Sequence, residues 1–61
     1  MTPIELAEMF EVTEGQVWSA LTVLNLFDEA KKPIPAAISG RFISEDGKIL
    51  RRGVSMLTNV L

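Results

Sequence analysis

Two stretches of the chain place apolar residues at helical spacing directly after a helix-capping sequence. In the first, Thr2 and Glu5 form a T-x-x-E capping box, and Pro3 between them favours the first position of a helix. Apolar residues then recur at helical spacing as far as Phe10, where we expect the helix to end. The pattern predicts a first helix over residues 3–10.

A second helix has the same start signal, because Thr13 and Gln16 form another capping box. Lys31 and Lys32 suit the negative end of a helix dipole, and Pro33 stops a helix, so we expect this one to continue to about residue 32. The apolar positions of its main stripe are Val17, Ala20, Leu21, Leu24 and Phe27.

A further apolar stripe lies beside the first one on this second helix, at Val23, Leu26 and Ala30. The combined apolar arc is wider than one short helix can cover by itself. We therefore expect either another subunit or the C-terminal segment to cover part of it.

The remainder of the chain predicts a connector and a β-hairpin. Pro33-Ile34-Pro35 is typical of a stiff, extended segment, and Asp46-Gly47 is a favoured two-residue type I′ turn between strand-like residues. Residues 54–61 fit either a short helix or a strand. The expected cross-strand pairs are Glu45–Lys48, Ser44–Ile49, Ile43–Leu50, Phe42–Arg51 and Arg41–Arg52.

Composition limits the class of protein. A chain of 61 residues is a single domain, 1–61, and hides only about 60% of the surface of its unfolded form. Because it has no cysteine and no histidine, disulfides and a structural zinc site are not expected. The hydrophobic content of 48% instead favours a homo-oligomer. No repeat or low-complexity stretch stands out.

The same counts argue against a membrane protein and against an enzyme. No stretch reaches the roughly 18 apolar residues of a membrane span, and no basic N-terminal stretch suggests a signal peptide, so we expect a cytoplasmic location. Histidine, cysteine, tyrosine and a Gly-rich phosphate loop are absent. Asp28 and Glu29 are neighbours on the predicted helix and point different ways. We expect no catalysis, no cofactor and no small-molecule substrate.

Charge divides the chain into two halves. Residues 1–29 carry six acidic residues and no base, whereas residues 30–61 carry six bases and two acids. The net charge is therefore −6 followed by +4, which indicates how partners would be oriented.

The stretch from Leu6 to Leu21 resembles a helix-turn-helix: Ala7 is the small residue where the helices cross, and Val12 is the turn hydrophobe. With Gly40-Arg41-Phe42 entering the hairpin, residues 1–53 resemble the small winged modules of the excisionase-like and MerR-like type. The family usually has glycine where this chain has Glu11. The resemblance implies an α+β fold, in which an N-terminal helix-turn-helix is followed by a β-hairpin wing and a short C-terminal segment.

The same resemblance implies a small transcriptional or recombination regulator, of phage or mobile-element type, that binds double-stranded DNA. Its second helix would enter the major groove, and the arginines of the hairpin would hold phosphates. In the predicted register Arg41 lies opposite Arg52, a like-charge pair that an anion would stabilise, and Arg51 opposite Phe42 fits a cation–π pair. The candidate DNA-binding residues are Thr13, Gln16, Trp18, Ser19, Thr22, Arg41, Lys48, Arg51 and Arg52.

Two other interpretations fit the same residues. Because the second helix has no arginine or lysine on its exposed face, its acidic surface and Trp18 suit a module or inhibitor that engages a basic protein. The acidic half of one subunit also suits the basic hairpin of another, which would give a self-assembling oligomer. The simplest alternative is that the arginines are only solvated and protect an edge hairpin from aggregation.

Overall fold

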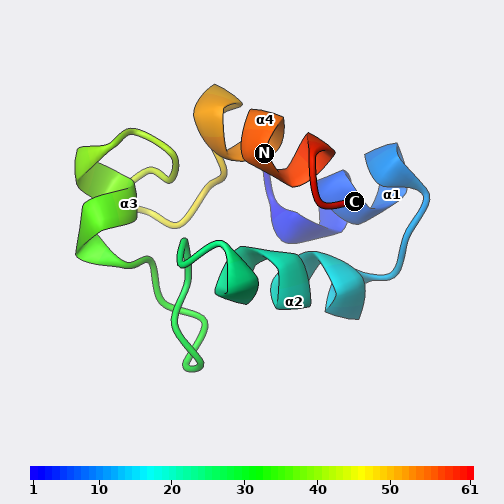
Figure 1. Cartoon of the computed structure of the whole chain (residues 1–61), viewed down its shortest axis with the longest axis horizontal. Helices are drawn as coiled ribbons and strands as arrows, with labels where there is room; N and C mark the ends of the chain where they lie inside the picture. The colour runs from blue at the N-terminus through cyan, green and yellow to red at the C-terminus, as the bar shows by residue number, and fades with distance from the viewer.

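The computed structural model describes all 61 residues as four helices joined by tight turns (Figure 1). The predicted α+β winged fold is wrong, because the chain has no β-hairpin wing and its only β pairs are two isolated bridges. None of the helices is long and apolar enough to cross a membrane. The helices are α1 (Pro3–Phe10), α2 (Glu14–Val23), α3 (Pro35–Ser39) and α4 (Arg51–Thr58).

The first helix begins and ends as predicted. The Thr2 backbone N–H donates to Glu5 Oε1 at 3.0 Å, and the Glu5 N–H donates to Thr2 Oγ1 at 3.3 Å, which completes the capping box. At the other end Glu11 takes the left-handed conformation with φ 58°. This lets the Val12 N–H reach the Ala7 carbonyl at 3.0 Å. A glutamate therefore occupies the conformation for which the resembling family uses glycine.

The start of α2 also confirms its prediction, but its end does not. The Thr13–Gln16 capping box is present, and the helix ends at Val23 instead of near Lys32. The chain leaves the helix because Asn25 is left-handed, with φ 59°, and the Leu26 N–H caps an α2 carbonyl. Asparagine tolerates this conformation better than most residues. The prediction followed the apolar periodicity, which does not reveal a helix end at an asparagine.

A tight turn over residues 28–32, which we call the Asp28 turn, replaces the predicted last turns of that helix. Asp28 Oδ1 accepts hydrogen bonds from the N–H groups of Ala30 and Lys32, both at 2.9 Å. An aspartate that bonds to the backbone two residues on favours a turn over a helix. Phe27 and Pro33 form a bridge at the base of this turn.

The segment around Gly47 is a turn with one bridge, and its register differs from the prediction by one residue. Ser44 pairs with Lys48 through a 2.8 Å backbone bond, and Ile43 forms a bridge with Ile49 around a three-residue loop. Both isoleucines are buried. The predicted two-residue turn would have placed them on opposite faces, so burial of the pair favours the observed register.

The C-terminal segment, which the sequence left open, forms α4. Its N-terminus follows directly on the bridge, so Arg51 and Arg52 belong to a helix and the predicted Phe42–Arg51 and Arg41–Arg52 strand pairs do not form. Leu57 is fully buried, and α4 contacts α2. The C-terminal segment therefore covers part of the apolar arc of α2, although Val23 stays 73% exposed.

One apolar cluster connects all four helices. It contains no polar or charged residue. The buried members are Leu6, Ala7, Val17, Ala20, Leu21, Leu26, Phe27, Ala37, Ile43, Ile49 and Leu57.

The backbone repeats although the sequence shows no obvious repeat. Left-handed Asn25 after α2 has its counterpart in Arg41 after α3, with φ 59° and 61°. The Phe27–Pro33 bridge likewise corresponds to Ile43–Ile49, and left-handed Lys31 corresponds to Gly47. Each turn therefore leads from one helix end to the start of the next helix by the same path.

Candidate functional site

Most polar side chains predicted to read DNA from α2 form hydrogen bonds within the helix itself. Gln16 Oε1 accepts from the Thr13 N–H at 2.9 Å, and the Thr13 hydroxyl is part of the same capping box. The Thr22 hydroxyl donates to the Trp18 carbonyl at 3.0 Å. Ser19 is exposed and forms no such bond. The side chains of α2 itself therefore offer a partner few free polar groups, and none of them is basic.

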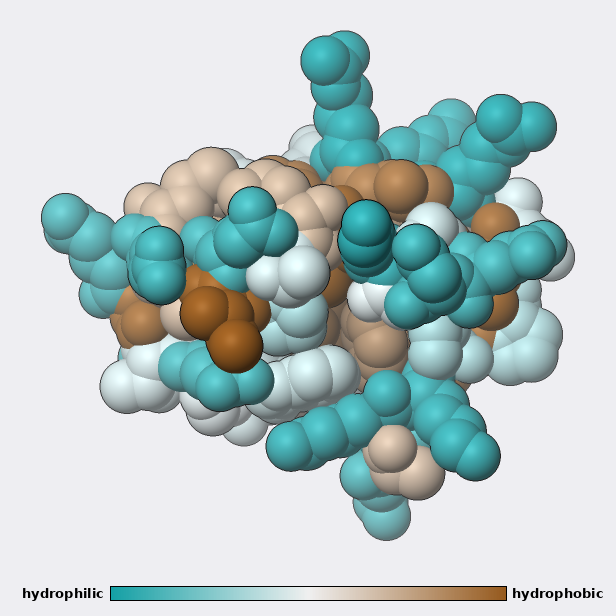
Figure 2. All heavy atoms as spheres, turned by 180° about the vertical axis from the view of Figure 1, so that it is seen from behind, coloured by the Kyte–Doolittle hydropathy of each residue, from teal (hydrophilic) through white to brown (hydrophobic).

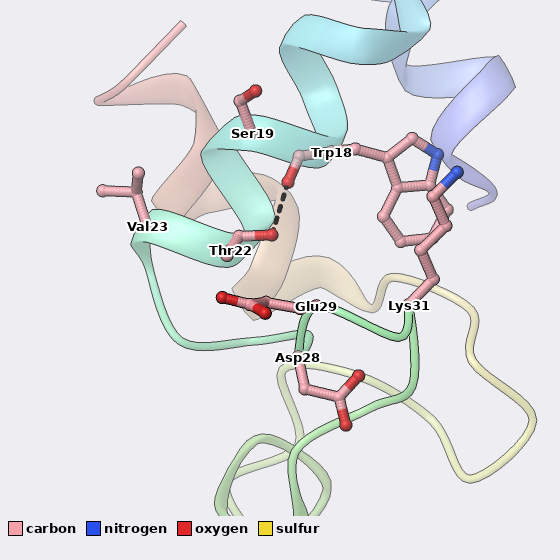
Figure 3. Close-up of a pocket in the computed structure, with 7 residues that line it drawn as sticks. All are labelled: Trp18, Ser19, Thr22, Val23, Asp28, Glu29 and Lys31. Carbon is pink, nitrogen blue, oxygen red and sulfur yellow. Dashed lines mark hydrogen bonds between the residues drawn. The ribbon is translucent and has the colours of Figure 1, made fainter.

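The half-buried Trp18 side chain contacts three other side chains, of which Figure 3 shows Lys31. Its Nε1 donates to Glu14 Oε2 at 3.2 Å, and its ring meets the Phe27 ring edge-on with the centroids 5.1 Å apart. The Lys31 ammonium lies 5.2 Å from the indole centroid. The indole thus covers the edge of the core through Phe27 and keeps a cation on its face.

The three arginines of the C-terminal half lie just after α3 and in the first turn of α4. Arg52 Nη1 donates to the Gly40 carbonyl at 3.1 Å, which brings this guanidinium next to the backbone of Arg41. Its carbon Cζ lies 5.8 Å from the centre of the Phe42 ring. The cation–π pair predicted for Arg51 is therefore made by Arg52, because the start of α4 changes the direction of both arginines.

Lys48 differs from the arginines because carboxylates lie near it. Hydrogen bonds from the backbone and side chain of Thr2, with smaller contributions from the N-terminal ammonium and Lys48, hold the pKa of Glu5 below its ordinary value. A hydrogen bond from the Ser44 hydroxyl, with a smaller contribution from Lys48, lowers the pKa of Asp46. The positive charge of Lys48 is thus partly balanced inside the molecule.

Helix α4 adds polar residues that the sequence prediction did not include. Arg51, Ser55 and Asn59 are exposed and lie four residues apart, which places them along one side of the helix. Residues 48–61 contain three bases and no acidic side chain. The helical spacing of the apolar residues Val54, Leu57 and Leu61 was the signal that could have predicted this helix. A helix here would in turn have placed the three polar residues on one face.

The other helices differ from α4 in charge. Charged side chains are acidic in α1, with Glu5 and Glu8, and in α2, with Glu14, and α3 has none. The basic residues brought together by the fold are therefore at the start of α4 and at Arg41, away from the α2 face that the resemblance assigned to DNA.

The large apolar side chains that stay exposed come from several parts of the chain. The rear view shows apolar atoms as separate small patches among projecting polar side chains (Figure 2). A continuous apolar surface is what marks extensive association sites. The large apolar residues that are exposed are Met1, Ile4, Met9, Val23, Leu50, Val60 and Leu61.

No group of three or more acidic residues is arranged to hold a metal ion. Comparison with protein families, with curated proteins and with solved structures found no significant match to this chain.

Proposed function

We propose that the protein binds double-stranded DNA through the exposed side of α4 and the arginines around its first turn. The observation that carries this proposal is the charge of α4, the one helix with arginines and no acidic residue. Lys and Arg side chains supply most of the attraction between a protein and the phosphate backbone. A regulator of transcription or recombination is the role implied by the helix-turn-helix resemblance.

Arg52 bonds to the Gly40 carbonyl and lies on the Phe42 ring, but neither Arg51 nor Arg52 stabilises the start of α4 through the helix dipole. Positive charge near the N-terminus of a helix opposes the helix dipole, and α4 has no side-chain cap and no acidic residue in its first turn. Arg51 and Arg52 are both exposed. A phosphate group at this end of the helix would offset the repulsion, which supports a role in anion binding.

The side chains that follow Arg51 along α4 suit contact with bases. Asparagine pairs with adenine edges in the major groove, and serine bonds to either base. Ser55 and Asn59 continue the line that Arg51 starts, whereas Gly53 and Leu57 face the core. The proposal thus moves the predicted DNA contact from α2 to α4, since α2 has no base and its polar groups are largely engaged.

The test is fluorescence anisotropy of a labelled mixed-sequence duplex, titrated with protein at several salt concentrations. Arg51→Ala and Arg41→Ala should each weaken binding for all sequences and reduce the slope of log affinity against log salt by about 1. Lys32→Ala is the matched control, because it removes one positive charge in the Asp28 turn. It should leave the slope nearly unchanged.

Two outcomes would contradict the proposal. Equal losses in Arg51→Ala and Lys32→Ala would mean that only the overall charge matters. A larger loss in Gln16→Ala or Ser19→Ala than in Arg51→Ala would return the contact to α2.

A further inference from the structure

We infer that a cavity beside Trp18 binds a cationic side chain of a basic protein, in the position that Lys31 now occupies. The cavity is open to solvent, has a volume of about 390 Å³ and lies between the last turns of α2 and the Asp28 turn (Figure 3). We call it the Trp18 pocket. Its lining residues are Trp18, Ser19, Thr22, Val23, Asp28, Glu29 and Lys31.

The indole in the Trp18 pocket is already oriented for a cation. Its Nε1 donates to Glu14 and its ring forms a T-shaped contact with Phe27, so the ring has little freedom to turn. A fixed aromatic face attracts ammonium and guanidinium groups through its quadrupole, and tryptophan does so best. Because the ring is held before binding, a ligand would lose little free energy in ordering it.

Lys31 shows which chemical group the Trp18 pocket accepts. Its ammonium lies 5.2 Å from the indole centroid, which is cation–π distance. Lys31 does so from a left-handed backbone, with φ 62°, where the equivalent turn has Gly47. Glycine would adopt the backbone conformation of this turn without strain. The Lys31 side chain is not needed for the turn, and it is the part of the residue that reaches the indole. Lys31 is therefore an internal ligand that a competing cation can displace.

The two carboxylates of the Trp18 pocket have different roles. Asp28 is engaged by two backbone N–H groups of its turn, and its carboxylate points away from α2 (Figure 3). Glu29 is exposed, takes no part in those bonds and extends along the end of α2, below Thr22 and Val23 in the view. Glu29 is thus the free counter-charge for an incoming guanidinium.

Charge complementarity defines the partner as a basic protein segment. Residues 1–29, which supply most of the pocket and the helices around it, carry six acidic residues and no base. Nucleic acid would be repelled from this side, and a peptide rich in arginine would be attracted. This inference does not depend on DNA binding by α4, which uses different residues.

The experiment follows the fluorescence of Trp18, the one tryptophan of the chain, during titration with an end-blocked peptide of alternating arginine and glycine. A peptide with citrulline in place of arginine keeps the shape and removes the charge. We expect saturable quenching with the arginine peptide and none with the citrulline peptide.

Two pairs of variants separate the Trp18 pocket from general attraction. Lys31→Gly removes the internal ligand and suits the left-handed backbone, so it should tighten peptide binding roughly threefold. Lys32→Ala changes the net charge equally and should tighten it less. Glu29→Gln should weaken binding roughly threefold, whereas Glu8→Gln on α1, outside the pocket, should have a smaller effect.

Several results would overturn the inference. Equal effects within either pair of variants would mean that peptide binding depends only on net charge. Quenching by the citrulline peptide would mean that binding does not require a cation. If tetramethylammonium binds as tightly as the peptide with the same dependence on Glu29, the pocket takes small cations and not a protein.

Discussion

At the scale of single residues, the left-handed positions of the backbone determine where helices end. Four residues other than glycine have positive φ: Glu11, Asn25, Lys31 and Arg41. The conformation costs about 1–2 kcal/mol for a residue with a side chain. Three of these residues end a helix, where the following N–H bonds to a helix carbonyl and offsets part of that cost.

Lys31 and Gly47 occupy equivalent positions of the two turns, so substitutions there measure the free-energy cost of the left-handed conformation. Gly47→Ala forces an alanine into φ 88° and should lower the free energy of unfolding by about 1–2 kcal/mol. Lys31→Gly relieves the same strain but loses the contact with Trp18, about 0.5–1 kcal/mol, so its stability should change by less than about 1 kcal/mol. Urea denaturation measures both values.

Equal destabilisation of these two variants would show that the turns are not equivalent in the folded protein. A stability gain well above 1 kcal/mol for Lys31→Gly would show that the Lys31–Trp18 contact contributes little.

At the scale of elements, α4 depends on a close approach to the preceding turn. A Cβ added to Gly53 would lie 2.6 Å from the Phe42 carbonyl oxygen and 2.8 Å from Ile49 Cγ2. Backbone cannot move aside as a flexible side chain can. Packing therefore requires a glycine at this position. The gain from this close packing outweighs the low helix propensity of glycine in an eight-residue helix.

Gly53→Ala should lower the free energy of unfolding by about 1–3 kcal/mol, because the added methyl group pushes α4 away from the turn. Gly15→Ala in α2 is the control, since its Cβ would meet only Thr13 Oγ1 at 3.9 Å. Alanine should stabilise that exposed helical position by about 0.5–1 kcal/mol. Thermal unfolding followed by circular dichroism compares the two, and a stabilised Gly53→Ala would contradict the packing of α4.

At the scale of the whole molecule, the single apolar cluster makes the four helices one cooperative unit. Leu57 comes from α4 and is fully buried in the same cluster as Leu6 of α1 and Val17 of α2. In a domain this small the net stability is only several kcal/mol. Losing one large contact in α4 should therefore unfold the distant helices as well.

Leu57→Ala should lower the free energy of unfolding by about 2–5 kcal/mol and shift the whole transition. Far-UV circular dichroism and the fluorescence of Trp18, which lies in α2, should report the same midpoint. Leu50→Ala, at a position that is 36% exposed, should have a smaller effect. Two separate midpoints in Leu57→Ala would show that α4 unfolds independently of α1 and α2.

The candidate sites show where prediction from the sequence ended. The six bases of the C-terminal half were evident, but the placement of four of them depended on a hairpin that does not form. These four are Arg41, Lys48, Arg51 and Arg52. Ser55 and Asn59 were missed because residues 54–61 fit both a helix and a strand. The Lys31–Trp18 contact was hidden by the overextended second helix, because the Asp28 turn is what brings Lys31 back toward the indole.

The sequence by itself determined the features that depend on a few adjacent residues. Both capping boxes start their helices as predicted, since each is completed by side chains three residues apart. Tertiary structure decided the register around Gly47 and the helical state of residues 51–58. The physical reason is burial: Ile43, Ile49 and Leu57 reach one common core only with these turns and this helix, and no local pattern contains that requirement.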